Sequence, residues 1–165
     1  MGRGFTLIET IMVIVIASIL GIALFMRWGP SDAARLEAAA RKISGDIRYA
    51  QKLSISTYEM AGVLFDANGY SVYAIVNSAA LANSPGGPCS KDASGKFVVD
   101  FREDRCSDFS GVTITPPLAN PLAFDTIGRP INNATGAALS TQTVGVNYKG
   151  AKNISIEAVT GRVSY

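Results

Sequence analysis

The chain has 165 residues, a formal net charge of +2 and 48% hydrophobic residues. A charge this close to neutral, spread along the chain rather than clustered, gives no electrostatic support to a nucleic-acid-binding protein or to a binder of acidic surfaces. About 135 residues follow Pro30, which is enough for one hydrophobic core and requires no second domain.

The first long segment of the chain is almost entirely apolar. As a helix, residues 5–26 reach about 33 Å, roughly the thickness of the bilayer hydrocarbon. We therefore predict a membrane-spanning helix over residues 5–28. A carboxylate inside that layer would cost a few kcal/mol without a partner, which makes Glu9 a candidate functional residue. The polar residues between Phe5 and Met26 are Thr6, Glu9, Thr10 and Ser18.

The residues before this segment form an unusual junction. Residues 1–4 read Met-Gly-Arg-Gly, and residues 5–9 read Phe-Thr-Leu-Ile-Glu. An ordinary secretory signal is cleaved after its apolar core, whereas here the plausible scissile residue, Gly4, precedes the core, so the core would be retained. The junction resembles the class III signal of type IV prepilins and type II secretion pseudopilins. The alternative is an ordinary membrane anchor with Glu9 among the lipid headgroups, which has no need for a Gly4–Phe5 junction.

The resemblance has consequences for processing, partners and location. It implies that a prepilin peptidase cleaves after Gly4, that the new amine of Phe5 is N-methylated, and that Glu9 neutralises the amine of a neighbouring subunit. Two charges that are costly alone in a low-dielectric helix bundle become tolerable as a pair. The implied partners are the peptidase, other pilin or pseudopilin subunits and the inner-membrane assembly platform. The implied location is the bacterial inner membrane, single-pass with the globular domain in the periplasm, and later a periplasmic or extracellular filament.

A second helix is predicted after a break. Pro30 disfavours a helical Gly29, and Ser31 and Asp32 are predicted to be capping residues for a helix over residues 32–57. The pattern leaves open whether Pro30 kinks one helix or separates two. The predicted apolar face carries Leu36, Ala40, Ile43, Ile47, Ala50 and Ser54, and the opposite face carries Arg41, Arg48 and Lys52.

Strand patterns follow residue 58. We predict a hairpin of residues 61–65 and 70–76, because Asp66 to Gly69 supplies the turn chemistry. Residues 77–95, rich in Ser, Ala, Gly and Pro, are predicted to form a long exposed loop. Further strand candidates are residues 96–101, 111–115, 122–125, 143–148, 153–159 and 162–165.

These elements predict an α+β fold in which a long N-terminal helix, its first half transmembrane, packs on an antiparallel β-sheet domain. We expect a prepilin leader over residues 1–4 and a transmembrane and assembly helix over residues 5–28. The periplasmic half of the stalk helix would follow over residues 29–57, and a β-rich globular head over residues 58–165.

The chain has two cysteines, Cys89 and Cys106. In an exported bacterial domain an even cysteine count indicates a disulfide, and closing this loop would contribute about 3 kcal/mol. Two free thiols, or half of a metal site, is the competing interpretation. The chain has no histidine and no CxxC spacing, which disfavours zinc.

Three later blocks, residues 62–73, 124–130 and 160–163, resemble the GspH/FimT-type minor pilins and pseudopilins. The resemblance implies a low-abundance subunit near the tip of a type II secretion or type IV pilus filament, where it helps to start assembly. The alternatives are a major type IV pilin and a competence minor pilin that binds DNA. Some relatives contact DNA through a C-terminal Gly-Arg-x-Arg. This chain keeps Arg162 but has Ser164 in place of the second Arg, so we expect weak or absent DNA binding, with Arg162 as the candidate contact.

We expect no enzyme, because a chain without histidine cannot build the usual Ser-His or Cys-His pairs. Carboxylates between residues 100 and 108 suggest a calcium site, but their spacing matches no EF-hand pattern. Because arginines alternate with them, we predict a solvated, mutually neutralising loop, and neither a metal site nor a cofactor. The acidic residues are Asp100, Glu103, Asp104 and Asp108, and the basic ones are Arg102 and Arg105.

Overall fold

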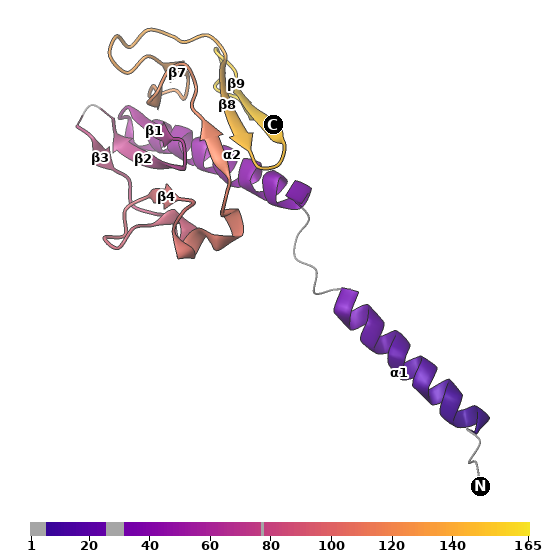
Figure 1. Ribbon diagram of the computed structural model, residues 1–165. Coiled ribbons are helices and arrows are strands. Elements are labelled where there is room, and N and C mark those ends of the chain that lie inside the picture. The colour runs from indigo at the N-terminus through magenta and orange to yellow at the C-terminus, as the bar shows by residue number, and fades with distance from the viewer. Residues whose placement is uncertain (1–5, 26–31, 77) are drawn as a thin grey trace. The chain divides into compact units, whose positions relative to one another are not determined.

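The computed structural model describes residues 6–25, 32–76 and 78–165 (Figure 1). The chain divides into two units, residues 1–31 and residues 32–165, and each is considered by itself. Gly4 and Phe5, the predicted processing residues, lie outside the described residues, as does the predicted break at Gly29 and Pro30.

Helix α1 (Leu7–Phe25) forms the first unit. The hydroxyl oxygen of Thr6 accepts a hydrogen bond of 3.4 Å from the backbone N–H of Glu9, which satisfies one of the free donors at the start of the helix. The hydroxyl of Ser18 donates to the carbonyl of Ile14 at 2.7 Å, so this polar group is satisfied within the helix. We predicted a membrane-spanning helix over residues 5–28; in the described parts of the chain, no helix is both long enough and apolar enough to cross a membrane.

Helix α2 (Asp32–Thr57) begins and ends where the sequence predicted. Its predicted apolar face is buried along its whole length, and Ala39 and Ser44 extend that face. Three alanines on this face have no exposed surface, so the strands approach the helix backbone closely: Ala39, Ala40 and Ala50. Arg41, Arg48 and Lys52 are exposed on the other side, as predicted.

The first sheet begins with the predicted hairpin, β1 (Ala61–Asp66) and β2 (Gly69–Ile75), in which Asp66 pairs with Gly69. Its strand order is β3-β2-β1-β6-β7, and β4 also pairs with β2. Gly69 is required at its position, because a Cβ atom there would lie 2.1 Å from the carbonyl oxygen of Val99 in β4. The remaining strands are β3 (Ala80–Leu81), β4 (Val98–Asp100), β6 (Leu122–Phe124) and β7 (Pro130–Ile131).

The second sheet has the order β10-β9-β8-β5 and is antiparallel throughout. A backbone hydrogen bond of 2.8 Å from Ile114 to the carbonyl of Ala67 joins it to the hairpin of the first sheet. Figure 1 shows α2 beside the strands of both sheets, and it contacts strands of each. The strands are β5 (Thr113–Thr115), β8 (Gln142–Asn147), β9 (Ala151–Ile156) and β10 (Val163–Ser164).

One hydrophobic core therefore joins α2 to both sheets. Residues 32–165 have the predicted α+β class, with antiparallel strands packed on a helix. The largest fully buried side chains of this core include Phe97, Phe124, Ile43, Ile47 and Ile154.

The prediction of a long exposed loop over residues 77–95 is wrong in part. Residues 80–81 form β3, and Ala82 is only 2% exposed. The backbone N–H of Ala82 donates to Val72 at 2.8 Å, and its carbonyl accepts from Phe97 at 2.9 Å. The segment is rich in turn residues, yet this pairing with two neighbouring strands holds its middle against the sheet.

Candidate functional site

Glu9 lies in the first turn of α1 and is exposed. A carboxylate at this position interacts favourably with the helix dipole, a contribution of about 0.3–1 kcal/mol at an exposed site. The apolar residues around it, Leu7, Ile8 and Met12, are also exposed. A helix that is apolar on all sides is stable where lipid or other helices cover it, so α1 offers a surface for burial with one acid at its start.

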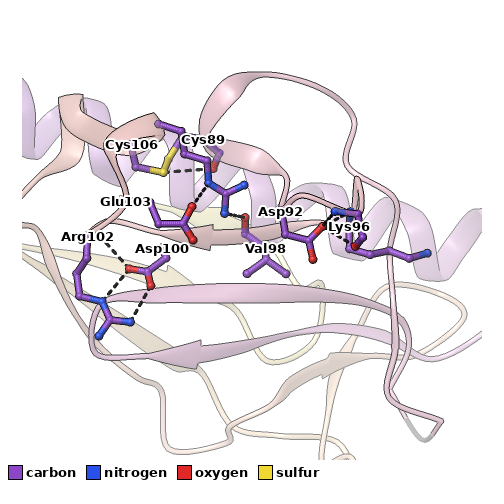
Figure 2. A network of polar contacts seen from close by, with 10 residues as sticks. Cys89, Asp92, Lys96, Val98, Asp100, Arg102, Glu103 and Cys106 are labelled. Atoms are coloured by element: carbon purple, nitrogen blue, oxygen red, sulfur yellow. Dashed lines mark hydrogen bonds and ion pairs between the residues drawn. A yellow bond between two sulfur atoms is a disulfide. The ribbon is translucent and has the colours of Figure 1, made fainter.

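The predicted disulfide is present in the structure and joins two short 3-10 helices. Cys89 belongs to η1 (Pro88–Ser90) and Cys106 to η2 (Asp104–Phe109), with their Cα atoms 4.8 Å apart. Both cysteines are buried in the core cluster. Figure 2 shows them beside the charged loop that contains Glu103. The bond therefore closes the loop of residues 89–106, which contains β4.

The charged loop near the disulfide is held by internal ion pairs (Figure 2). The guanidinium of Arg102 donates two hydrogen bonds to the Asp100 carboxylate, at 3.0 and 2.7 Å. These bonds hold the pKa of Asp100 below its ordinary value. Arg105 forms an ion pair with Glu103 and donates to the carbonyl of Val98.

Carboxylates held in this way are poorly placed to bind a cation. In the residues that the structure describes, no group of three or more acidic, histidine or cysteine side chains is arranged to hold a metal ion. Asp92 instead organises its own turn, accepting from the backbone N–H groups of Ser94 and Lys96 at 2.8 and 2.9 Å. The hydroxyl of Ser94 also donates to it, and this bond is the main reason that the pKa of Asp92 is lowered.

The basic residues near the C-terminus do not form a free cluster. Arg129 pairs with Asp125 at 2.9 Å. Lys149 pairs with Asp32 at 3.0 Å, and this contact raises the pKa of Lys149. Lys152 is paired with Glu37. Arg162, the candidate DNA contact, is exposed and lines a shallow polar pocket that it shares with Glu157.

Two of the resemblance blocks, residues 124–130 and 160–163, meet at one side chain of α2. The amide nitrogen of Gln51 donates to the carbonyls of Gly128 at 2.7 Å and Thr160 at 3.3 Å. Gly161 has φ +65°, and a Cβ atom there would lie 2.3 Å from the Gly128 carbonyl oxygen and 2.4 Å from the Gln51 amide nitrogen.

Gln51 was not among the residues predicted from the sequence. Its position on α2 could have suggested its role. Gln51 lies between the apolar and basic faces of the helix, and a long polar side chain at such a boundary can reach neighbouring turns. The two blocks therefore have a structural role at the end of the head, where they are fastened to the helix.

Comparison with known proteins gives one sequence similarity. The chain is 34% identical over 71 residues to the competence protein ComGD of Bacillus subtilis (strain 168), covering 42% of this chain and 50% of that protein. The chain thus spans about half the length of this curated relative. No protein-family model matches the chain, and no solved structure matches it. The similarity supports a relationship to type IV pilin-like proteins in general and does not single out the GspH/FimT type.

The disulfide is expected to stabilise the head by about 3 kcal/mol, because it closes a loop in the unfolded chain. Replacing both Cys89 and Cys106 with Ser should lower the free energy of unfolding by about that amount in urea denaturation. Non-reducing mass spectrometry of the wild-type protein should find one intramolecular bridge. Complete alkylation of both thiols without reductant would refute this prediction.

Gly161→Ala is expected to lower the free energy of unfolding by about 2 kcal/mol or more. Alanine is disfavoured in the left-handed backbone conformation of this position, and its Cβ atom would clash with the carbonyl oxygen of Gly128. Gly136→Ala is the matched control, since Gly136 has φ +68° but faces open space. The control should lose only about 1 kcal/mol. Equal losses in the two variants, measured by urea denaturation, would show that the contact between the two blocks contributes nothing.

Proposed function

We propose that this chain is a minor pilin-like subunit of a type IV pilus or type II secretion filament, and that it polymerises through its N-terminal helix. The observation that carries the proposal is the order of residues at the start of the chain. A Gly-Phe junction precedes an apolar helix with a single acid, Glu9, in its first turn. The similarity to a competence protein and the α+β head support the same broad class.

In this proposal the prepilin peptidase cleaves after Gly4, and the amine of Phe5 is methylated. We propose that residues 5–28 anchor the subunit in the inner membrane before assembly. This step rests on the sequence of the whole segment, which as a helix would reach the thickness of the hydrocarbon layer; the part that the structure describes, α1, does not by itself qualify as a membrane span. Glu9 is the group that makes assembly selective. Its charge is costly in an apolar bundle until the N-terminal amine of a neighbouring subunit pairs with it.

The head acts by contact with other subunits rather than by catalysis. It lies on the outer side of the inner membrane, where an oxidising environment preserves disulfides such as that between Cys89 and Cys106. In residues 100–105, Arg102 pairs with Asp100 and Arg105 pairs with Glu103, which fits a structural role for these four side chains.

A DNA-uptake subunit is the second candidate, and the similarity to a competence protein favours it. Phosphate binding requires several free Lys or Arg side chains on one surface. In this head Arg129, Lys149 and Lys152 are each paired with a carboxylate, and Glu157 lines the same pocket as Arg162. These contacts weigh against a DNA role for the C-terminal residues.

Glu9→Ala should insert into the membrane and be processed normally, since the change makes the segment more apolar, but should enter filaments at least tenfold less efficiently. Loss of one partner of a buried ion pair costs about 3 kcal/mol or more, which is sufficient for such a reduction. The measurement is a quantitative immunoblot of sheared filaments against membranes. Ser18→Ala is the control, because the Ser18 hydroxyl is satisfied within its own helix. Wild-type incorporation of Glu9→Ala would contradict the pairing proposal.

The full chain in detergent micelles should bind duplex DNA weakly or not at all at physiological salt. Any residual binding should be insensitive to Arg162→Ala. Gel retardation at several salt concentrations measures both quantities. Tight retardation that weakens steeply with salt and is abolished by Arg162→Ala would instead place the DNA-uptake candidate first.

A further inference from the structure

The disulfide between Cys89 and Cys106 is buried while the head is folded. Cys106 is 1% exposed and Cys89 is 7% exposed, and both belong to the core cluster. Disulfides form, break and exchange when a thiolate attacks a disulfide sulfur, so the reaction requires access to the sulfur atoms. Burial also opposes the oxidation of free cysteines, because apolar surroundings raise the pKa of a thiol and lower the fraction of reactive thiolate. The bond is therefore made when at least one cysteine lies outside the core.

One of the two elements that the disulfide joins, η1, has few polar contacts with the rest of the head. Gly86 and Gly87 precede it, and glycine allows the backbone many conformations. Among the described residues, no backbone hydrogen bond joins η1 to a strand or to α2, since the N–H of Ser90 donates to Gly87 within the same turn. In η2, by contrast, Arg105 donates to the carbonyl of Val98 in β4. We therefore expect η1, which contains Cys89, to be the element that detaches first.

One charged side chain of α2 connects that helix to η1. The Nζ atom of Lys42 donates to the hydroxyl oxygen of Ser90 at 2.9 Å and to the Asp46 carboxylate at 2.8 Å. It also lies 5.9 Å from the centre of the Phe97 ring. Ser90 is buried, and the Lys42 side chain is only 16% exposed, so little water competes for this contact. Because Ser90 adjoins Cys89, a strong charge-assisted hydrogen bond holds the segment of that cysteine against the head.

We propose that exchange at the Cys89–Cys106 bond, in either direction, takes place while η1 is detached from α2, and that Lys42 closes the site by binding Ser90. The oxidation that forms the bond then precedes the docking of η1. The inference concerns the head alone and is independent of assembly through residues 5–28.

The reaction that supplies the closed head is a thiol–disulfide exchange with an external disulfide. The thiolate of Cys89 attacks a sulfur of that oxidant, which gives a mixed disulfide and releases one thiolate of the oxidant. The thiolate of Cys106 then attacks the Cys89 sulfur and releases the second thiolate. Two cysteine thiols are oxidised, one external disulfide is reduced to two thiols, and the protons pass through the solvent.

Reduction of the full chain by dithiothreitol in detergent micelles tests the proposal, because it is the same exchange in reverse. Reduction should be at least about a hundredfold slower in native buffer than in concentrated urea, since it waits for η1 to open. Ser90→Ala removes the acceptor on η1 and does not alter Lys42 or Asp46. It should be reduced about tenfold faster than the wild type in native buffer, as expected for loss of one hydrogen bond to a charged group, and equally fast in urea. Mass spectrometry of alkylated samples follows the loss of the bond.

Ser94→Ala is the matched control, because Ser94 lies in the same disulfide loop but its hydroxyl donates to Asp92 and not to α2. It should be reduced at the wild-type rate. Low urea concentrations separate the opening of η1 from unfolding of the head, since local opening exposes little surface and its rate should change little below the unfolding transition. Equal rates in Ser90→Ala and Ser94→Ala would overturn the proposal. So would rapid reduction of the folded wild type, or a rate that rises with urea as steeply as global unfolding does.

Discussion

The head depends on the burial of one face of α2. Ala39, Ala40 and Ala50 are fully buried and allow strands of both sheets to pack close to the helix. Ile43 and Ile47 fill the space between the sheets, and burying each of them stabilises the fold by about 1.5–3 kcal/mol. Because the two sheets share this helix and one core, a change on this face affects the whole head.

Polar contacts add to the apolar packing that positions α2. Near the start of α2, Lys152 pairs with Glu37 and is the main reason that the pKa of Glu37 is lowered. Near its middle, Lys42 pairs with Asp46 at 2.8 Å and donates to Ser90, the neighbour of Cys89. Burial, followed by the nearby Asp46 carboxylate, raises the pKa of Tyr70, whose hydroxyl donates to Asp46. The disulfide-bonded segment and the first sheet are thereby tied to one helix turn.

Local patterns predicted α2, the hairpin and most strands, because these depend on the spacing of apolar residues and on turn chemistry. The error at Ala82 arose because backbone pairing with Val72 and Phe97 holds a segment whose composition is typical of loops. Strand β7 was missed because two residues carry no periodicity. The importance of Gln51 could not be judged from sequence, since its role depends on contacts with two turns distant in the chain. Glu9 could be identified, because an acid in an apolar run is visible without any structure.

The proposed function assigns a role to each of the two parts of the chain, the N-terminal helix and the head. The N-terminal helix supplies an apolar surface with one acid, and in the head Arg129, Lys149 and Lys152 are each paired with a carboxylate. The proposed function requires that the apolar helix is retained after processing at Gly4. Mass spectrometry of the N-terminal peptide of the protein isolated from its native membranes tests this requirement. We expect a chain that begins at Phe5 with a methylated amine. A chain that still carries residues 1–4, or one that has lost the apolar segment, would contradict it.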